Sequence, residues 1–345
     1  MLKSKSKILK IGPGYINRVD AVLSECDVSG KILFVTDPVV DNLFGGIIRP
    51  QLERLGKVKI EYVDNNTISY AMSVAERVIA TDVNFIVGLG GGKVLDVCKY
   101  AAYISKKPVI SIATTMANDG IASPIAVLKR MDGKPKSLSC APPSVLLLDT
   151  ELILNSPPQL IKAGIGDTIS NHMALLDWEL ACSRDKDVMN GYAYLMSQTS
   201  FDALVKTQYD SITPEFIEVL ANSLVLSGIA MDFAGSSRPV SGSEHLFSHA
   251  LDYYSEKPSL HGIQVALGTV AVLKLIEHEY QSVVDYLHRF GVDVNPAHLG
   301  IDEATFVNCM QKATSMRSGR YTYLHETDLN SKRLAEIYKD LVKEL

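Results

Sequence analysis

The sequence predicts an α/β nucleotide-binding domain followed by an all-α domain, and three observations lead to this fold class. The chain has 345 residues, which is long for a single hydrophobic core. Short apolar runs alternate with helical patterns in the first half, and from Ser156 onward long helical patterns almost exclude strand-like runs. We therefore place the boundary near Asn155–Pro158, with an α/β domain over residues 1–155 and a helical domain over residues 156–345.

In the first half, five short apolar runs are expected to be strands, and two segments between them are expected to be helices. The helices are Ser69–Thr81 and Val94–Ser105, whose apolar residues recur at helical spacing. Strands that alternate with helices are typical of a parallel, doubly wound sheet. The expected strands are Lys31–Thr36, Val58–Val63, Phe85–Gly88, Val109–Ile112 and Val145–Leu148.

In the second half, seven segments have the periodicity of helices, and no repeat or low-complexity tract interrupts them. Their apolar residues recur three and four positions apart, so each helix buries one face. The expected helices are Gly166–Ser183, Asp187–Tyr209, Pro214–Ala234, Ser243–Tyr254, Gly262–Glu279, Tyr280–Phe290 and Glu303–Ser315.

Composition and charge exclude several classes of protein. The formal net charge is −5 with acids and bases interspersed, so the basic stripe of a nucleic-acid-binding protein is missing. The longest apolar run, around Val265–Ile276, is too short to span a bilayer. Five dispersed cysteines without CxxC spacing fit a reducing compartment. The basic start, Lys3, Lys5, Lys7 and Lys10, lacks the apolar run of a signal peptide. We expect a cytoplasmic protein without a membrane span.

A glycine-rich turn joins an expected strand to an expected helix. Gly90, Gly91 and Gly92 let backbone amides approach a pyrophosphate, and the N-terminus of the following helix favours negative charge. Lys93 and Asp96 follow, so the order is neither GxGxxG nor a Walker A sequence. The turn is a candidate nucleotide site, and a tight turn without a ligand is the alternative.

Two further segments follow expected strands, where ligands gather in open α/β sheets. Asp37 ends the first strand, and a carboxylate there accepts hydrogen bonds from an adenosine ribose and repels a 2′-phosphate. The small, polar loop after the fourth strand contains Thr114, Thr115, Asp119 and Ser123. For both segments an ordinary turn is the alternative, because Asp-Pro and Asp-Gly pairs are common in turns.

Three histidines and one acid form a candidate metal site. His245 and His249 lie on one helix face, since residues four apart are neighbours. His261 begins another helix after a short loop, and Asp167 lies at the start of a helix further upstream. One carboxylate and two imidazoles would leave a divalent ion with open positions for substrate. Helix histidines are also common as surface or hydrogen-bonded residues, which is the alternative.

Eight motifs together resemble the sn-glycerol-1-phosphate dehydrogenase family. That family shares a superfamily with glycerol dehydrogenase, iron-dependent alcohol dehydrogenases and dehydroquinate synthase. The resemblance extends from about residue 30 to residue 325, and the combination is far more specific than any one motif. The motifs are Gly90–Lys99, Asn118–Pro124, Ala163–Asp167, Asp177–Ala181, Ser237–His245, His245–Asp252, Leu260–Gly262 and Gly319–Thr322.

The resemblance implies a dehydroquinate synthase-like fold, a set of site residues and two cofactors. The metal ligands would be Asp167, His245 and His261, holding one divalent ion, with Zn²⁺ first and Ni²⁺ or Fe²⁺ as alternatives. Asp119 would face substrate and nicotinamide, and His249 would orient substrate or relay a proton. Many family members have a histidine where this chain has Asn118. NAD(H) or NADP(H) would contact Asp37, Gly90, Gly91, Gly92, Lys93, Asp96, Thr114, Thr115 and Ser123.

The implied reaction is reversible hydride transfer between dihydroxyacetone phosphate and sn-glycerol 1-phosphate, with a role in phospholipid synthesis. A glycerol or other polyol dehydrogenase, a dehydroquinate synthase-like cyclase and a non-catalytic nucleotide-binding protein are the alternatives. We expect a phosphorylated triose or glycerol as substrate, a homo-oligomer (a dimer or higher), and no nucleic acid as partner. The substrate phosphate needs donors, for which Arg238, Ser241, Ser243 and Arg320 are candidates, and both arginines have ion-pair or surface roles as alternatives.

Overall fold

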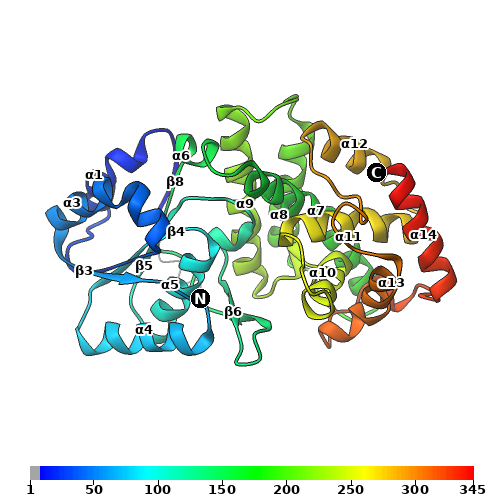
Figure 1. Cartoon of the computed structure of the whole chain (residues 1–345), viewed down its shortest axis with the longest axis horizontal. Helices are drawn as coiled ribbons and strands as arrows, with labels where there is room; N and C mark the ends of the chain where they lie inside the picture. The colour runs from blue at the N-terminus through cyan, green and yellow to red at the C-terminus, as the bar shows by residue number, and fades with distance from the viewer. Residues whose placement is uncertain (1–7) are drawn as a thin grey trace. The chain divides into compact units, whose positions relative to one another are not determined.

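A computed structural model describes residues 8–345, so Lys3, Lys5 and Lys7 of the basic start lie outside the described residues. The chain forms two compact units (Figure 1). The first runs up to Met116 and includes Gly120–Pro158. The second comprises Ala117–Asp119 and Gln159–Leu345. The first is an α/β unit and the second is all-α within the described residues, so the predicted fold class is confirmed.

The first unit is built on a six-stranded, fully parallel sheet, and all five expected strands are present in it. The sixth strand includes Lys10, the last lysine of the basic start. The strand order is β1-β8-β5-β4-β2-β3. The strands are β1 (Ile8–Gly12), β2 (Gly30–Thr36), β3 (Gly56–Tyr62), β4 (Phe85–Gly90), β5 (Val109–Ala113) and β8 (Val145–Asp149).

Helices cover both faces of this sheet (Figure 1), which explains why its central strands are apolar on both sides. On β2, Ile32 and Phe34 face the core under α1 and α3, whereas Leu33 and Val35 face the core under α4 and α5. The helices are α1 (Val19–Glu25), α2 (Pro38–Val40), the π-helical turn η2 (Asp41–Gly45), α3 (Gly46–Leu55), α4 (Ile68–Ala80), α5 (Gly92–Ser105) and α6 (Thr150–Leu154), with 3₁₀ turns η1 (Tyr15–Asn17) and η3 (Asp119–Ile121).

The first unit also contains an antiparallel hairpin that the sequence analysis did not predict. Its strands are β6 (Ile125–Lys129) and β7 (Pro135–Ser139). Gly133 closes the turn with φ +79°, and the Asp132 side chain accepts a hydrogen bond from the Lys134 amide. The Asp132-Gly133 pair is a typical hairpin signal.

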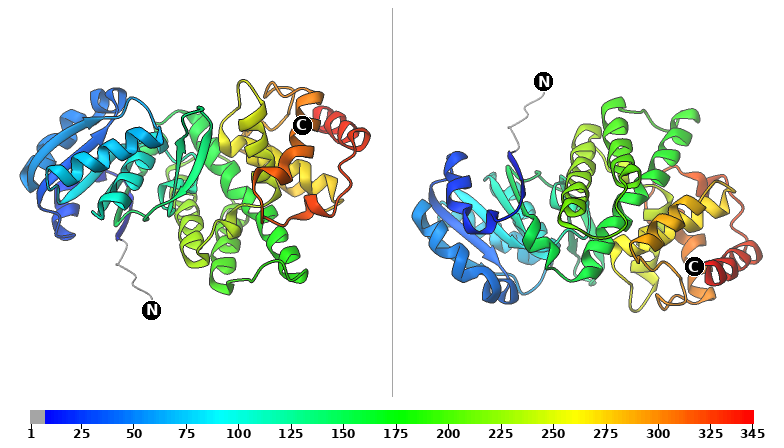
Figure 2. Two further views of the ribbon diagram at one scale, coloured as in Figure 1. Left: turned by 90° about the horizontal axis from the view of Figure 1, so that it is seen from below. Right: turned by 90° about the horizontal axis from the view of Figure 1, so that it is seen from above.

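The second unit is a stack of helices without a sheet between them, as Figure 2 shows. The helix expected from Gly166 begins earlier, at Pro158, so the prediction that Asp167 lies at the start of a helix is wrong: it lies inside α7. Two other expected helices are clearly shorter in the structure. The helix expected from Asp187 begins at Gly191, because the Asn190 side chain caps it. The helix expected to reach Glu279 ends at Leu275, and Glu277 has φ +57°. The helices are α7 (Pro158–Ser183), α8 (Gly191–Lys206), α9 (Pro214–Ala234), α10 (Ser243–Tyr254), α11 (His261–Leu275), α12 (Gln281–Arg289), α13 (Glu303–Lys312) and α14 (Ser331–Glu344), with 3₁₀ turns η4 (Arg238–Val240), η5 (Ala313–Met316) and η6 (Tyr323–His325).

Helix α9 corrects one expectation about apolar length. By length and composition it is the one helix among residues 8–345 that is apolar enough to cross a bilayer, so the prediction that no such stretch exists is wrong. Of its most apolar window, 61% is buried within the protein. Phe216, Leu220 and Leu224 are fully buried, as in a helix of a protein core.

Candidate metal centre and nucleotide-binding turn

The sheet of the first unit has a topological switch point between β2 and β4. The chain leaves β2 to form β3 on one side, and β4 then pairs with the other side of β2 before the chain continues to β5. In doubly wound sheets, ligands bind beyond the carboxyl ends of the strands at this point. Asp37 follows β2 and Gly91 follows β4, so the structure places both at the switch point.

The glycine-rich turn has little free space on one side and open space on the other. A side chain at Gly90 would meet Val94 at 2.8 Å, and one at Gly91 would meet the Thr115 hydroxyl at 3.0 Å. Gly92, the first residue of α5, has nothing within 4 Å of a Cβ position. No side chain caps this helix N-terminus. The turn therefore offers uncapped backbone amides beside open space, which suits a pyrophosphate.

Thr114 and Thr115 lie beside this turn, and Ser123 lies in the loop that follows. The Thr114 amide donates to the Gly90 carbonyl at 3.1 Å, and Thr114 is buried. The Ser123 hydroxyl donates to the Ile125 carbonyl at 3.4 Å and is also buried. The structure thus brings Thr114 and Thr115 to the glycine turn, whereas it gives the Ser123 hydroxyl a partner in its own loop.

The three predicted charged residues of this region all have protein partners. Asp37 caps α2 by accepting hydrogen bonds from the Val39 and Val40 amides. Lys93 donates to the Asp64 carbonyl at 2.6 Å. Asp96 accepts from the Val127 amide at 3.0 Å and pairs with Lys99 at 3.0 Å. Nucleotide contacts by these three remain predictions, and they would share the side chains with these structural partners.

In the second unit, Asp167, His245 and His261 converge on one point. Each offers a ligand atom, and these atoms all lie within 4.8 Å of one another. His261 Nε2 lies 3.7 Å from Asp167 Oδ1, and the rings of His245 and His261 are 4.9 Å apart. The His249 ring lies further off, 6.3 Å from His245 and 6.4 Å from His261, and it is outside this group. The three residues come from α7, α10 and α11.

Two glycines allow the close helix contact that brings these residues together. A Cβ at Gly166, next to Asp167, would overlap the Gly262 carbonyl oxygen. A Cβ at Gly262, next to His261, would overlap the Ala163 carbonyl oxygen. The backbones of α7 and α11 therefore touch at this crossing, which any larger residue would push apart. Asp167 reaches His261 because of that contact.

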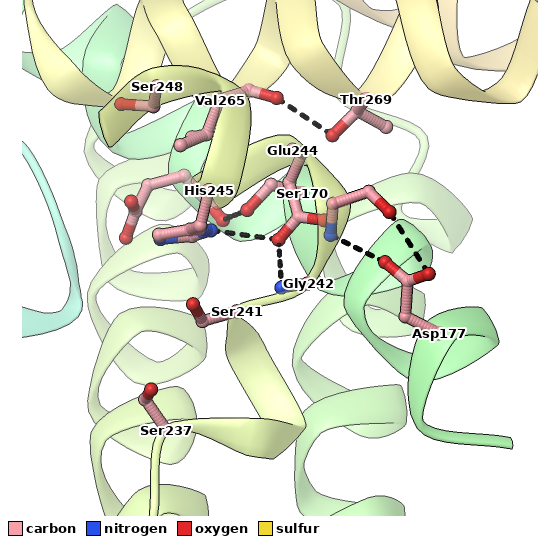
Figure 3. Close-up of polar contacts among 12 residues, drawn as sticks. Ser170, Asp177, Ser237, Ser241, Gly242, Glu244, His245, Ser248, Val265 and Thr269 are labelled. Carbon is pink, nitrogen blue, oxygen red and sulfur yellow. Dashed lines mark hydrogen bonds and ion pairs between the residues drawn. The ribbon is translucent and has the colours of Figure 1, made fainter. Parts of the chain in front are cut away.

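A carboxylate orients the His245 ring (Figure 3). His245 Nδ1 lies 2.8 Å from Glu244 Oε1, which also accepts from the Gly242 amide at 2.7 Å. Burial raises the pKa of Glu244 to about 7. In its ionised form this carboxylate only accepts, so Nδ1 of His245 carries the proton and the Nε2 lone pair stays available. Glu244 is fully buried, as expected for an outer partner that fixes a metal-binding imidazole.

A hydroxyl and an amide orient His261 in the same way. The Ser248 hydroxyl donates to Gln264 Oε1 at 2.6 Å, so its oxygen accepts from His261 Nδ1 at 3.0 Å. Gln264 is held in turn by the Ser259 carbonyl at 2.9 Å. His261 Nε2 therefore also presents a lone pair, and it points toward Asp167. Sequence reasoning missed the roles of Glu244, Ser248 and Gln264.

Burial keeps the imidazoles neutral, which is the form that binds a metal. Burial, and then the charges of Arg320 and Arg317, lower the pKa of His245 to about 3. Burial and the neighbouring His245 lower the pKa of His261 to about 3. Burial, and then the charge of Asp119, raise the pKa of Asp167 well above its usual range. Two neutral nitrogens and a desolvated carboxylate fit a divalent cation, whose charge would relieve the cost of burying the carboxylate.

Asp119 and His249 lie around this group in different ways. The Asp119 amide donates to Asp167 Oδ2 at 2.9 Å, which leaves Oδ1 on the side of His261. The ring nitrogens of His249 make no hydrogen bond to any of residues 8–345 and are open to another partner. The side chains of both residues are partly buried.

Of the residues predicted to bind a substrate phosphate, Ser243 is engaged elsewhere. Its hydroxyl and its amide both donate to Asp177, at 3.1 and 2.5 Å. Asp177 also accepts from the Tyr323 amide at 2.7 Å, so it joins α7 to the start of α10 and to the first residue of η6. Ser243 therefore helps to position the helix that carries His245.

Comparison with known proteins identifies relatives over nearly the whole chain. Residues 10–157 match the iron-containing alcohol dehydrogenase family. The chain is 35% identical to a glycerol-1-phosphate dehydrogenase [NAD(P)+] of Hyperthermus butylicus over 333 residues, which cover 95% of each chain. It is 36% identical to the enzyme of the same name from Thermofilum pendens, with 92% of this chain and 91% of that one covered.

Among solved structures, the fold is similar to glycerol dehydrogenase from Schizosaccharomyces pombe. The TM-score is 0.80 at 18% identity, with 98% of this chain and 89% of that one covered. At this identity the likeness describes the fold alone. The identity to the curated relatives is higher and spans both units, and it shows that this chain belongs to the glycerol-1-phosphate dehydrogenase family.

Proposed function

We propose that this protein interconverts dihydroxyacetone phosphate and sn-glycerol 1-phosphate with NAD(H) or NADP(H) and one divalent metal. The observation that carries the proposal is the orientation of His245 and His261. Each ring donates a hydrogen bond from Nδ1 to a buried partner. Its Nε2 lone pair is then free to face the point where Asp167 Oδ1 lies. Membership of the family supports the choice of substrate and nicotinamide cofactor, because the names of the relatives contain both.

Each residue has a separate task in this proposal. Asp167, His245 and His261 would hold the metal, which supplies Lewis-acid polarisation of the substrate oxygen when bound. Glu244 and Ser248 fix the imidazole tautomers. His249 has open ring nitrogens and is neutral, because burial lowers its pKa to about 3, and it would orient the substrate or relay a proton through its two ring nitrogens. Asp119 would face the substrate, and its backbone amide already donates a hydrogen bond to Asp167.

In the first unit, the amides at Gly91 and Gly92 would receive the pyrophosphate. Thr114 and Thr115 would line the same turn. Asp37, at the end of β2, would accept from the adenosine ribose and would favour NAD over NADP by repelling a 2′-phosphate. Lys93, Asp96 and Ser123 would complete the surroundings of the nucleotide.

Four finer assignments belong to the proposal: the metal, the compartment, the oligomeric state and the pathway. Zn²⁺ is the metal we expect first, with Ni²⁺ and Fe²⁺ as alternatives, because nitrogen and carboxylate ligands accept all three. All five cysteines are free thiols, which fits a reducing cytoplasm. We also propose a homo-oligomer, and a place in phospholipid synthesis through the glycerol 1-phosphate product.

The test is oxidation of NADH and of NADPH with dihydroxyacetone phosphate. The protein is assayed as isolated, after chelation, and after reloading with Zn²⁺, Ni²⁺ or Fe²⁺. We expect activity with dihydroxyacetone phosphate that disappears on chelation and returns with at least one ion. Dihydroxyacetone serves as the unphosphorylated comparison. Absence of turnover of dihydroxyacetone phosphate under every metal and both cofactors would contradict the proposal.

A further inference from the structure

Three arginines gather around one serine in the second unit. Arg238 and Arg320 are almost completely buried, with 3% and 5% of their surface exposed, whereas Arg317 is exposed. The Ser237 hydroxyl accepts from Arg317 at 2.8 Å and from Arg320 at 3.0 Å. Arg320 also donates to the Ser241 carbonyl at 2.5 Å. These contacts bring guanidinium groups from distant parts of the sequence to one place.

The positive charge at this place is poorly compensated by the protein. Arg238 pairs with Asp187 through Nε at 2.7 Å, but both of its terminal nitrogens are buried and have no hydrogen-bond partner within residues 8–345. Arg320 has no carboxylate within ion-pair distance among residues 8–345. Buried charges and unsatisfied donors are costly unless an opposite charge meets them. The group is therefore suited to receive an anion.

This arginine group lies close to the candidate metal centre. Ser241 and Ser237 are on the loop that leads into the helix carrying His245, as Figure 3 shows. Only three residues separate Ser241, whose carbonyl holds Arg320, from His245. An anion at the arginines would thus be a short distance from a group held at the histidines.

We propose that Arg238, Arg317 and Arg320 form the subsite for the phosphate monoester of the substrate. Planar guanidinium groups match phosphate oxygens in paired hydrogen bonds. The Ser237 hydroxyl, which accepts two bonds and donates none within residues 8–345, would add a fourth donor. This subsite rests on the proposed function. In it, the arginines are the residues by which the enzyme distinguishes a phosphorylated triose from an unphosphorylated one.

The experiment uses the metal-loaded full chain and two substitutions, Arg320→Gln and Arg317→Gln. Inorganic phosphate is titrated by calorimetry and tested as a competitor of dihydroxyacetone phosphate. For each variant, the ratio of kcat/KM for dihydroxyacetone phosphate to that for dihydroxyacetone is measured together with metal content. Loss of a charge-assisted hydrogen bond should lower this ratio by about 10- to 100-fold and weaken phosphate binding to a similar extent. Arg289→Gln, an exposed arginine of the same unit, is the matched control and should change neither quantity.

The outcomes test the phosphate subsite and the proposed function separately. If the wild type turns over dihydroxyacetone phosphate but both variants keep the ratio and the phosphate affinity, the arginines do not bind the phosphate. If the wild type binds inorganic phosphate, the variants lose it and no substrate turns over, the anion site stands and the proposed function fails. Arg317 is exposed, so Arg317→Gln remains informative if Arg320→Gln does not fold.

Discussion

The turn after β4 presents backbone atoms to a ligand, whereas the group around Asp167 presents side-chain atoms. At Gly90, Gly91 and Gly92 there are no side chains, and the helix N-terminus presents backbone amides without a cap. At Asp167, His245 and His261 the side chains provide every ligand atom, and each imidazole is oriented by a second buried residue. A backbone site is damaged by adding atoms, whereas a side-chain site is damaged by removing them.

The largest expected effect comes from removing a ligand, as in His245→Ala. We expect the affinity for Zn²⁺ to fall by more than the roughly 10- to 100-fold that loss of an outer partner causes, because one of three ligand atoms disappears. Competition with a chromogenic chelator measures this affinity, and circular dichroism checks folding. His298→Ala removes an exposed histidine paired with Asp293 and is the control. A His245→Ala protein that binds Zn²⁺ as tightly as the wild type would remove His245 from the site.

The ligand-orienting residues provide a second comparison, between Glu244→Gln and Ser248→Ala. Each change removes the charge or hydroxyl that fixes one imidazole, and we expect Zn²⁺ affinity to fall by about 10- to 100-fold. Nitrogen NMR of the rings should show a mixture of tautomers for His261 in Ser248→Ala. Thr269→Val removes a buried hydroxyl that bonds only to the Val265 carbonyl, so it should leave Zn²⁺ affinity unchanged. Equal affinities in all four proteins would show that neither partner orients a ligand.

The sequence predicted most of the fold, and the missed elements have local explanations. The segment Pro38–Leu55 is helical, but Gly45, Gly46 and Pro50 are residues that usually interrupt helices. The structure accommodates them with the π-helical turn η2 before α3. Helix α14 buries only Leu334 and Leu341, so its apolar pattern is sparse.

The candidate site was predictable in its residues but less so in its geometry. Helical spacing placed His245 and His249 on one face, and it could not say which is nearer Asp167. The structure distinguishes them through the contact of α10 with α11, where His245 and not His249 approaches His261. Arg238 and Arg320 were candidates from the sequence, but Ser248, Gln264 and Arg317 depend on tertiary contacts, for which a single sequence has no signal.

A gain of one methyl group tests the backbone site in the first unit. In Gly92→Ala the new Cβ meets no protein atom within 4 Å, and alanine favours a helix over glycine by up to about 1 kcal/mol. We therefore expect unchanged or higher stability together with about tenfold weaker NADH binding, since the methyl group occupies the space of the pyrophosphate. Thermal unfolding and fluorescence titration measure the two quantities. Gly46→Ala, at the open first position of α3, should raise stability without affecting NADH. Unchanged NADH affinity in Gly92→Ala would place the nucleotide elsewhere.

The pH dependence of metal binding sharpens the comparison within the second unit. His245 and His261 have pKa values near 3, so above pH 4 they are neutral and no proton must leave them when a metal binds. Asp167 has its pKa raised by burial, so below that pKa the carboxyl must release a proton first. Zn²⁺ affinity should therefore fall by about tenfold for each pH unit below the pKa of Asp167, with about one proton released per ion.

Calorimetry in buffers of different ionisation enthalpy counts these protons. In Asp167→Asn the affinity should be weaker, and it should depend less on pH than in the wild type, because His245 and His261 stay neutral above about pH 4. The dependence that remains should come from Glu244, which contacts His245 and whose pKa burial raises to about 7. Release of two or three protons from the wild type would mean that the imidazoles are charged before the metal binds. In that case burial would not keep His245 and His261 neutral. Glu244 and Ser248 would then have to hold the two rings in their metal-binding orientation while a proton competes with the metal for the ring nitrogens.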